Sequence, residues 1–204
     1  MEDRKYLDDL RDIREMMNRS TQFISLSGMS GVLAGVYALI GAYLANRMLN
    51  QRTHSAVSYR ISDQTVFWIF VIAAAVLFLS IATAFIMTTM KARKNGETVW
   101  NVTSRRLVIN FLIPLVTGGV FALLLLRHGS YLLIAPITLI FYGLACVNAS
   151  KYTFRDVRYL GITIIILGLI SIECWGYALE FWALGFGVCH IIYGGIMHFK
   201  YDRA

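Results

Sequence analysis

The chain has 204 residues, of which 57% are hydrophobic and only 15% are charged. Soluble domains carry about 25% charged residues, so this composition excludes an ordinary water-soluble domain and indicates a chain that lies mostly in lipid. The net charge of +7 does not indicate a nucleic-acid partner, because the basic residues flank apolar segments instead of clustering on a polar module.

Residues 1–20 are predicted to form a short cytoplasmic amphipathic helix. Tyr6, Leu10, Ile13 and Met17 recur at spacings that place them on one helical face. The small-residue cleavage site of a secretory signal is not evident. Two interpretations remain open. The segment is either a solvated lead-in to the first membrane span, or a helix that docks onto a protein partner or a second copy of the chain.

The first predicted span covers about residues 21–45 and carries a stripe of small residues. Ser27, Gly31 and Gly35 follow one another at one-turn spacing. Small residues let helix backbones approach closely in lipid. The stripe therefore predicts either packing within the bundle or a face for a homo-oligomer.

Five further apolar segments predict five further spans. They cover about residues 65–90, 107–126, 130–149, 158–178 and 181–199, and a short tail, 200–204, follows. Each is close to the ~20 residues that cross a bilayer as a helix. The predicted fold class is an all-α integral membrane bundle of six transmembrane helices, arranged as three hairpins over residues 21–199 and preceded by the amphipathic helix.

The distribution of lysine and arginine predicts the orientation. Fifteen of them fall in the N-terminal segment, the even-numbered connections and the tail, whereas four fall in the odd-numbered connections. Basic residues are retained on the cytoplasmic side. Both termini are therefore expected in the cytoplasm, and the protein is expected to be a multi-pass protein of the bacterial inner membrane.

Asn110 and Asn148 form a predicted interhelical polar pair. Each is nineteen residues from the turn centred near residue 129, so both should lie at the same depth in neighbouring helices. We interpret them as structural hydrogen-bonding groups in preference to a substrate site.

Glu173 is the first candidate for an intramembrane functional group, because an ionisable residue inside an apolar span is costly. It is predicted to lie roughly 8 Å below a very short turn near Leu179. Glu173, Tyr177 and Glu180 would share one helical face if the helix continued that far. Glu173 is then either a titrating carboxylate or cation ligand, or a carboxylate that reaches interfacial water.

His190 is the second candidate and is predicted near the middle of the last span. It is either a hydrogen-bonding group between helices or part of a water-bridged proton relay with Glu173. Haem ligation is a weaker alternative, because no second mid-span histidine faces it. No cofactor and no metal site are expected. Cys146, Cys174 and Cys189 lie in apolar segments without C-x-x-C spacing and are interpreted as small apolar residues.

No enzyme signature of the H-E-x-x-H, G-x-S-x-G or P-loop type occurs in the chain. The leading hypothesis is a non-enzymatic sensor, accessory or assembly component. Its expected partners are the lipid bilayer and either a second copy or a protein bound through the N-terminal helix or the first span. The alternative is a small proton- or cation-coupled transporter that uses Glu173, with or without His190.

Overall fold

The computed structural model describes residues 26–50, 63–94, 96, 99–174 and 176–202. The amphipathic helix predicted for residues 1–20 lies outside these described residues. The described part of the chain is helical and contains no strand. Its helices are α2 (Gly28–Asn50), α3 (Asp63–Lys94), α4 (Val102–Arg127), α5 (Ile134–Ala149), α6 (Asp156–Glu173), α7 (Ala178–Trp182) and α8 (His190–Met197).

Short non-α segments complete three of these elements. A 3-10 turn, η1 (Tyr131–Leu133), leads into α5. The π-helical segment η2 (Ala183–Cys189) joins α7 to α8, and a second one, η3 (His198–Asp202), continues α8 to the end of the described chain. The last helix is therefore one continuous rod from residue 178 to residue 202.

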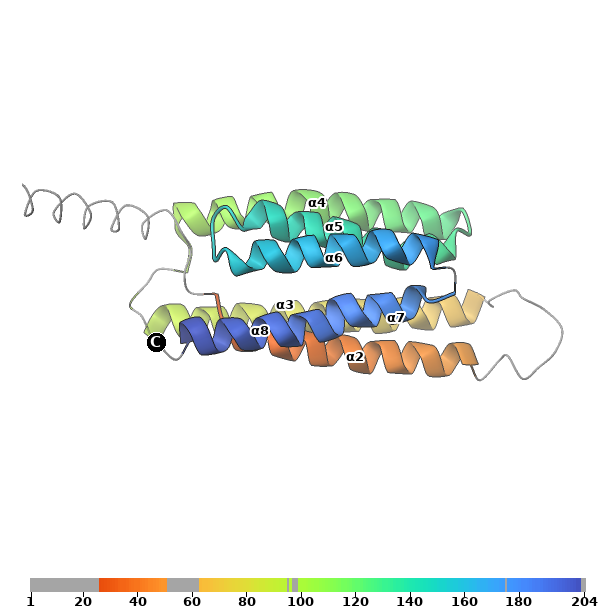
Figure 1. Cartoon of the computed structure of the whole chain (residues 1–204), viewed down its shortest axis with the longest axis horizontal. Coiled ribbons are helices and arrows are strands. Elements are labelled where there is room, and N and C mark those ends of the chain that lie inside the picture. Colours follow the sequence, from red (N-terminus) through yellow and green to blue (C-terminus); the bar gives the residue numbers. More distant parts are fainter. Residues whose placement is uncertain (1–25, 51–62, 95, 97–98, 175, 203–204) are drawn as a thin grey trace, which may run out of the picture.

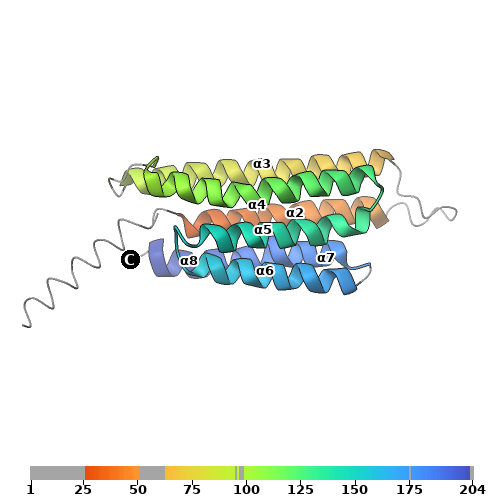
Figure 2. The ribbon, with the colours of Figure 1, turned by 90° about the horizontal axis from the view of Figure 1, so that it is seen from above.

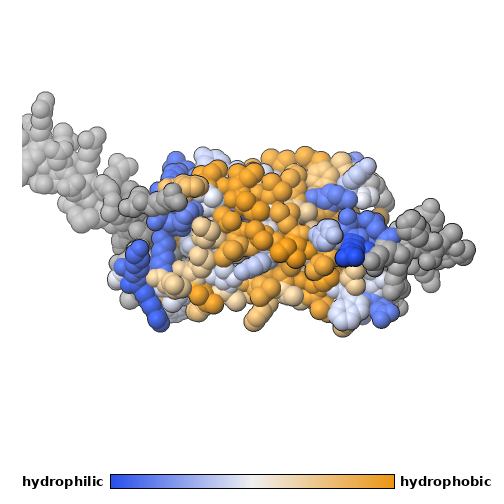
Figure 3. All heavy atoms as spheres, turned by 90° about the horizontal axis from the view of Figure 1, so that it is seen from below, coloured by the Kyte–Doolittle hydropathy of each residue, from blue (hydrophilic) through white to orange (hydrophobic). Residues whose placement is uncertain are grey.

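Several helices are long and apolar enough to cross a membrane, as the composition predicts. Five candidate spans occur in the described part of the chain, namely Gly28–Asn50, Gln64–Lys94, Val102–Arg127, Tyr131–Ala149 and Ala178–Asp202. The face of the bundle in Figure 3 carries an apolar belt across its middle and hydrophilic side chains at both ends. The described part of the chain is thus all-helical and consistent with a multi-pass membrane protein, and α6 is not among these five candidates.

The helices form two layers that lie face to face. Figure 1 shows α4, α5 and α6 in one layer, and α3, α2 and the rod α7–α8 in the other. Within the layers, α5 packs against α4 and α6, and α2 packs against α3 and α8. The layers are joined where α6 and α5 meet the last rod. Helices that are distant in sequence, such as α2 and α8, are therefore direct neighbours (Figure 2).

Two seams, one in each layer, are packed through glycine. A Cβ atom on Gly194 of α8 would meet backbone atoms of Gly28, Gly31 and Val32 of α2. In the other layer, a Cβ on Gly143 of α5 would meet the carbonyl oxygen of Gly161 of α6, and the reverse is also true. Larger residues would force these backbones apart, so glycine sets the spacing of both seams.

The edge formed by α3 and α4 is packed very differently. Thr65 and Ala92 are the only described residues of α3 that are buried. The buried residues of α4 are Ser104 and Gly118. The two helices do not pack substantially against each other. The bundle is therefore loose along this edge and tight along the glycine seams.

Two predicted helix boundaries are wrong by several residues. The first span was expected over 21–45, of which 21–25 lie outside the described residues, and α2 runs from Gly28 to Asn50. The Asp202 carboxylate accepts a hydrogen bond from the Gly28 N–H at the start of α2. The fifth was expected over 158–178, but α6 ends at Glu173. A left-handed residue, Gly176, with φ of 95°, then turns the chain before α7 begins.

Candidate functional site

His190 is buried between the two layers, with 6% of its surface exposed. It is the first residue of α8, directly after the π-helical segment. Its Nδ1 atom lies 3.0 Å from the carbonyl oxygen of Gly185, and its Nε2 atom lies 2.7 Å from the hydroxyl of Tyr142 on α5. A carbonyl only accepts hydrogen bonds, so Nδ1 carries the proton and Nε2 of the neutral ring accepts from Tyr142. His190 is thus an interhelical hydrogen-bonding group with both nitrogens satisfied.

Aromatic rings surround this histidine. Phe186 stacks on His190 with ring centroids 6.0 Å apart, and Trp182 and Tyr142 each lie 4.9 Å from Phe186. Phe111 of α4 meets Tyr142 edge to face. The side chains at positions 182, 186 and 190 recur every four residues and so form a column along one face of the last rod.

A cavity of about 450 Å³ lies beside this column, between the two layers. Ala74 and Leu77 of α3 and Gly119 and Leu123 of α4 line its sides, and His190 lies in its wall. Small molecules bind in cavities of about 300–1,000 Å³. The space is therefore large enough for a ligand.

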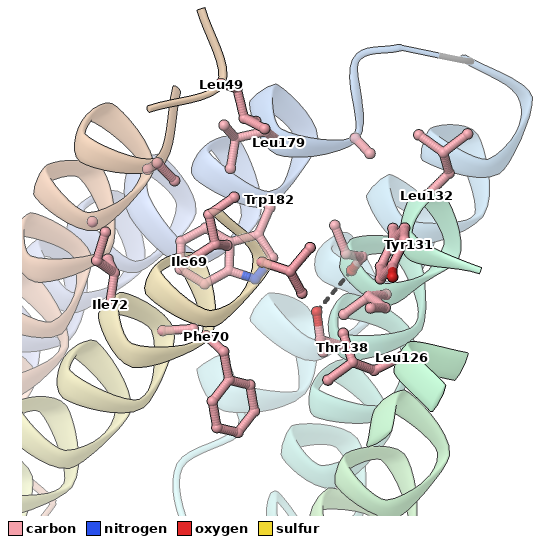
Figure 4. A pocket seen from close by; sticks show the side chains of 18 of the residues that line it. Leu49, Ile69, Phe70, Ile72, Leu126, Tyr131, Leu132, Thr138, Leu179 and Trp182 are labelled. Carbon is pink, nitrogen blue, oxygen red and sulfur yellow. Dashed lines mark hydrogen bonds between the residues drawn. The ribbon is translucent and has the colours of Figure 1, made fainter. Parts of the chain in front are cut away.

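A second cavity, of about 320 Å³, adjoins the first at the end of the bundle away from Lys91. Both cavities share residues of α3, α4 and α5, together with Trp182. Figure 4 shows Trp182, Ile69 and Thr138 among the side chains around this second space. Among the described residues, no aspartate, glutamate, lysine or arginine lies in the wall of either cavity. Together they form what we call the interlayer cleft, which is apolar apart from a few neutral polar groups.

Glu173 lies apart from the interlayer cleft. It is the last residue of α6 and is exposed, and its carboxylate makes no hydrogen bond or ion pair in the described part of the chain. The helix does not continue to Tyr177 and Glu180, because the turn at Gly176 interrupts it. The predicted common face of Glu173, Tyr177 and Glu180 is therefore wrong, and both Tyr177 and Glu180 are also exposed.

The structure brings Asn110 and Asn148 together. The side-chain amide of Asn148 donates to the backbone carbonyl of Asn110 at 2.9 Å and lies 3.5 Å from the side-chain oxygen of Asn110. Asn110 in turn donates to the carbonyl of Arg106. The pair ties α4 to α5 near the end of the bundle where α3 finishes.

The small-residue stripe of α2 is used within the chain. Gly31 and Gly35 face Gly194, Gly187 and Ile191 of the last rod, and Ser27 is buried. The rod therefore covers the stripe that sequence reasoning left open as a face for a second copy.

A polar cluster at the end of the bundle was missed from the sequence. Asp202 accepts hydrogen bonds from Lys91 at 2.6 Å, from His198 at 2.9 Å and from the Gly28 N–H at 3.1 Å. These four groups come from α2, α3 and the end of the last rod. Only the i,i+4 spacing of His198 and Asp202 is visible in the sequence, and this spacing alone does not predict the cluster. We call it the basic-end clasp.

A second contact at the same end holds α6. Asp156 accepts hydrogen bonds from Tyr201 at 2.7 Å and from Lys200 at 3.0 Å. Partial burial raises the pKa of the Asp156 carboxyl, but these two donors outweigh the burial, and the pKa lies below its ordinary value. The carboxylate is thus favoured in its charged form.

No group of three or more histidine, cysteine, aspartate or glutamate side chains is placed to hold a metal ion within the described ranges. Cys146, Cys174 and Cys189 are free thiols, and Cys146 and Cys189 are buried.

No protein-family model, no curated protein and no solved structure matches this chain. Its function has to be inferred from its own residues.

Proposed function

We propose that this protein is a non-enzymatic sensor, accessory or assembly component of the bacterial inner membrane, with six spans and both termini in the cytoplasm. α6 is the sixth span. Its 18 residues extend about 27 Å, close to the ~30 Å hydrocarbon core. Its charged residues, Asp156, Arg158 and Glu173, lie near its two ends, where they can reach water.

The orientation is supported by the basic residues at one end of the bundle. Lys91, Arg93 and Lys94 lie in the last turn of α3, and Arg105 and Arg106 lie in the first turns of α4. Lysine and arginine are enriched on the cytoplasmic side of membrane proteins. The end that carries the basic-end clasp is accordingly the cytoplasmic end.

One observation supports a non-enzymatic role most directly. His190 and Tyr142 in the cleft wall are paired with each other, Asn148 is paired with Asn110, and most of the described residues around the space between the layers are apolar. A transferase or hydrolase needs a nucleophile, acid or base that faces its substrate. His190 is the one group of the usual acid–base type (imidazole, carboxyl or amine) among the described residues of the cleft wall, and both of its nitrogens are engaged by Tyr142 and the Gly185 carbonyl, so binding is the role that the cleft fits.

The alternative is a proton- or cation-coupled transporter that uses Glu173, either alone or in a relay with His190. Glu173 is exposed at the end of α6 and lines neither cavity, whereas His190 is buried and lines one of them. This separation disfavours a relay between them. Glu173→Gln in reconstituted vesicles is the matched test of this alternative, since loss of proton or cation flux with the fold intact would favour transport.

The accessory role is tested by removing residues 1–18 from the full chain. We expect the intact protein to crosslink to one defined partner in membranes, and we expect the deletion to abolish that crosslink. Monodisperse purification and an unchanged helical circular dichroism spectrum would show that the bundle remains folded. A folded deletion variant that keeps every crosslink, or an intact protein with none, would contradict the proposal.

A further inference from the structure

We propose that the interlayer cleft binds one acyl chain of a bilayer phospholipid, which enters between α3 and α4 and places its ester carbonyl at the indole N–H of Trp182. The inference deepens the proposed function, on which it rests, by naming the chemical class of the ligand.

The cleft has the size and chemistry that an acyl chain requires. Its two adjoining cavities measure about 450 and 320 Å³. Their walls are made almost entirely of alanine, valine, leucine, isoleucine, phenylalanine and glycine. A charged or strongly polar ligand would lose its hydration there without compensating bonds. An apolar chain loses nothing of that kind.

The entrance to the cleft lies between α3 and α4. An opening between two membrane-spanning helices faces lipid. The cavity-lining residues Phe70 and Leu77 of α3 are 49% and 54% exposed, and Leu123 of α4 is 49% exposed. A Cβ atom on Gly119 of α4 would meet nothing within 4 Å. Both helices are candidate membrane spans. At this depth an open edge faces the hydrocarbon tails of the bilayer.

Trp182 supplies the polar contact. Its indole nitrogen makes no hydrogen bond in the described part of the chain, and Figure 4 shows it directed into the space between the layers. Indole N–H is a donor only, so it needs an acceptor such as a carbonyl oxygen. Trp182 lies four residues from the start of α7, roughly 6 Å below the end of the rod. Tryptophan side chains are enriched at this level of the bilayer, where they can reach the lipid headgroup region.

His190 and Tyr142 lie at the other end of the cleft, away from the entry level of Trp182. His190 lies eight residues beyond Trp182 on the same rod, about 12 Å further in. Because the imidazole and the hydroxyl bond to each other and to the Gly185 carbonyl, this end carries no free charge. It fits the apolar tip of an acyl chain better than a headgroup.

Photo-crosslinking of lipid to the full chain tests the assignment. The protein is reconstituted in vesicles of phosphatidylethanolamine and phosphatidylglycerol that contain a small fraction of phosphatidylglycerol with a diazirine near one acyl terminus. Adducts are mapped by mass spectrometry after irradiation. In the unchanged protein we expect adducts on interior residues of the cleft, including Phe141 and Tyr142, besides those on the outer surface.

Two phenylalanine substitutions form a matched pair. Gly119→Phe places a ring in the cleft. Gly195→Phe places one on α8, where a Cβ also meets nothing within 4 Å and where the residue lines neither cavity of the cleft. We expect the first to abolish the interior adducts and the second to leave them unchanged. Trp182→Phe keeps an aromatic ring but removes the N–H. We expect about fivefold fewer interior adducts, since a typical net hydrogen bond is lost.

Three results would overturn the assignment. One is a set of adducts confined to the outer surface, and another is a set of interior adducts that Gly119→Phe does not reduce. The third is a different occupant of the cleft. Native mass spectrometry would then show an isoprenoid quinone or a protein segment retained by the protein, and no interior lipid adducts would form. If the crosslink to a partner of the N-terminal segment persists in that case, the proposed function stands without this ligand. Interior adducts, together with partner crosslinks that survive the deletion of residues 1–18, would support the lipid assignment and contradict the proposed accessory function.

Discussion

The glycine seams and the α3–α4 edge have the same apolar composition but opposite packing. Where α2 meets α8, the backbones are so close that a Cβ atom on Gly194 has no room. Where α3 passes α4, a cavity of about 450 Å³ separates them. Apolar character alone does not drive helices together in lipid, because lipid tails are equally apolar. Close backbone approach decides which helices pack.

The same difference appears within a single helix. Gly118 of α4 is buried, and a Cβ atom there would meet the side chain of Phe141 on α5. The next residue, Gly119, faces the cleft, and a Cβ there would meet nothing. One side of α4 is therefore packed against α5, whereas the other side faces the cleft. The open side offers room for a ligand without disturbing the fold.

The largest expected effect comes from filling the seam. We expect Gly194→Leu to lower the free energy of unfolding by about 3 kcal/mol or more, because overpacking is costly and the atoms in its way are backbone of α2. Unfolding in detergent, followed by circular dichroism, measures the change. Gly195→Leu on the same helix is the control and should change the stability by less than about 0.5 kcal/mol. Equal stability of the two variants would show that close backbone contact at Gly194 does not hold α8 against α2.

The second effect concerns the bond that bridges the layers beside the cleft. His190→Phe should lower the stability by about 1–2 kcal/mol, because it leaves the Tyr142 hydroxyl and the Gly185 carbonyl without their partner. A double-mutant cycle with Tyr142→Phe should give a coupling of about 1 kcal/mol. Strictly additive losses would show that the two side chains do not depend on each other.

The third effect tests how the open-edge helix α4 is held to α5. We expect Asn148→Leu to cost about 0.6 kcal/mol, the average for a hydrogen bond between membrane helices. Thr117→Val is the control, because the Thr117 hydroxyl bonds only within α4, to the Ile113 carbonyl. A similar loss in both variants would mean that the interhelical bond adds nothing.

The smallest effect is a pH dependence at the end of α6 that carries Asp156. The pKa of Asp156 lies below its unfolded value of about 3.9, so its contribution is fully present above that pH and is lost as the pH falls through the lower, folded-state pKa. The contribution is about 0.5 kcal/mol or less, since Lys200 is half exposed. Asp156→Asn should remove this part of the acid dependence, and an unchanged pH profile would contradict it.

Local features of the chain were predictable from the sequence. Long apolar segments predict membrane-spanning helices because the bilayer sets their length. The equal distance of Asn110 and Asn148 from one turn predicts their common depth, and they do lie together. The glycines of α2 predict a close contact, but not that α8 makes it.

The site itself was less predictable. Glu173 attracted attention as a charge near an apolar segment, yet Gly176 ends the regular backbone just beyond it and leaves the carboxylate exposed. The sequence assigns no role to Trp182, which is one of several aromatic residues in the last apolar segment. Its position in the wall of the cleft depends on α3, α4 and α5, which the sequence does not place around it.

The sequence by itself determined that the chain is helical, that its helices are of membrane-spanning length and where its basic residues gather. Only the tertiary structure decided that α8 returns to α2, that His190 bonds to Tyr142 forty-eight residues away, and that α3 and α4 leave a cleft between them. The physical reason is that membrane helices are apolar on nearly every side. Periodicity, which identifies the buried face of a helix in water, then says little about which helix will be its neighbour.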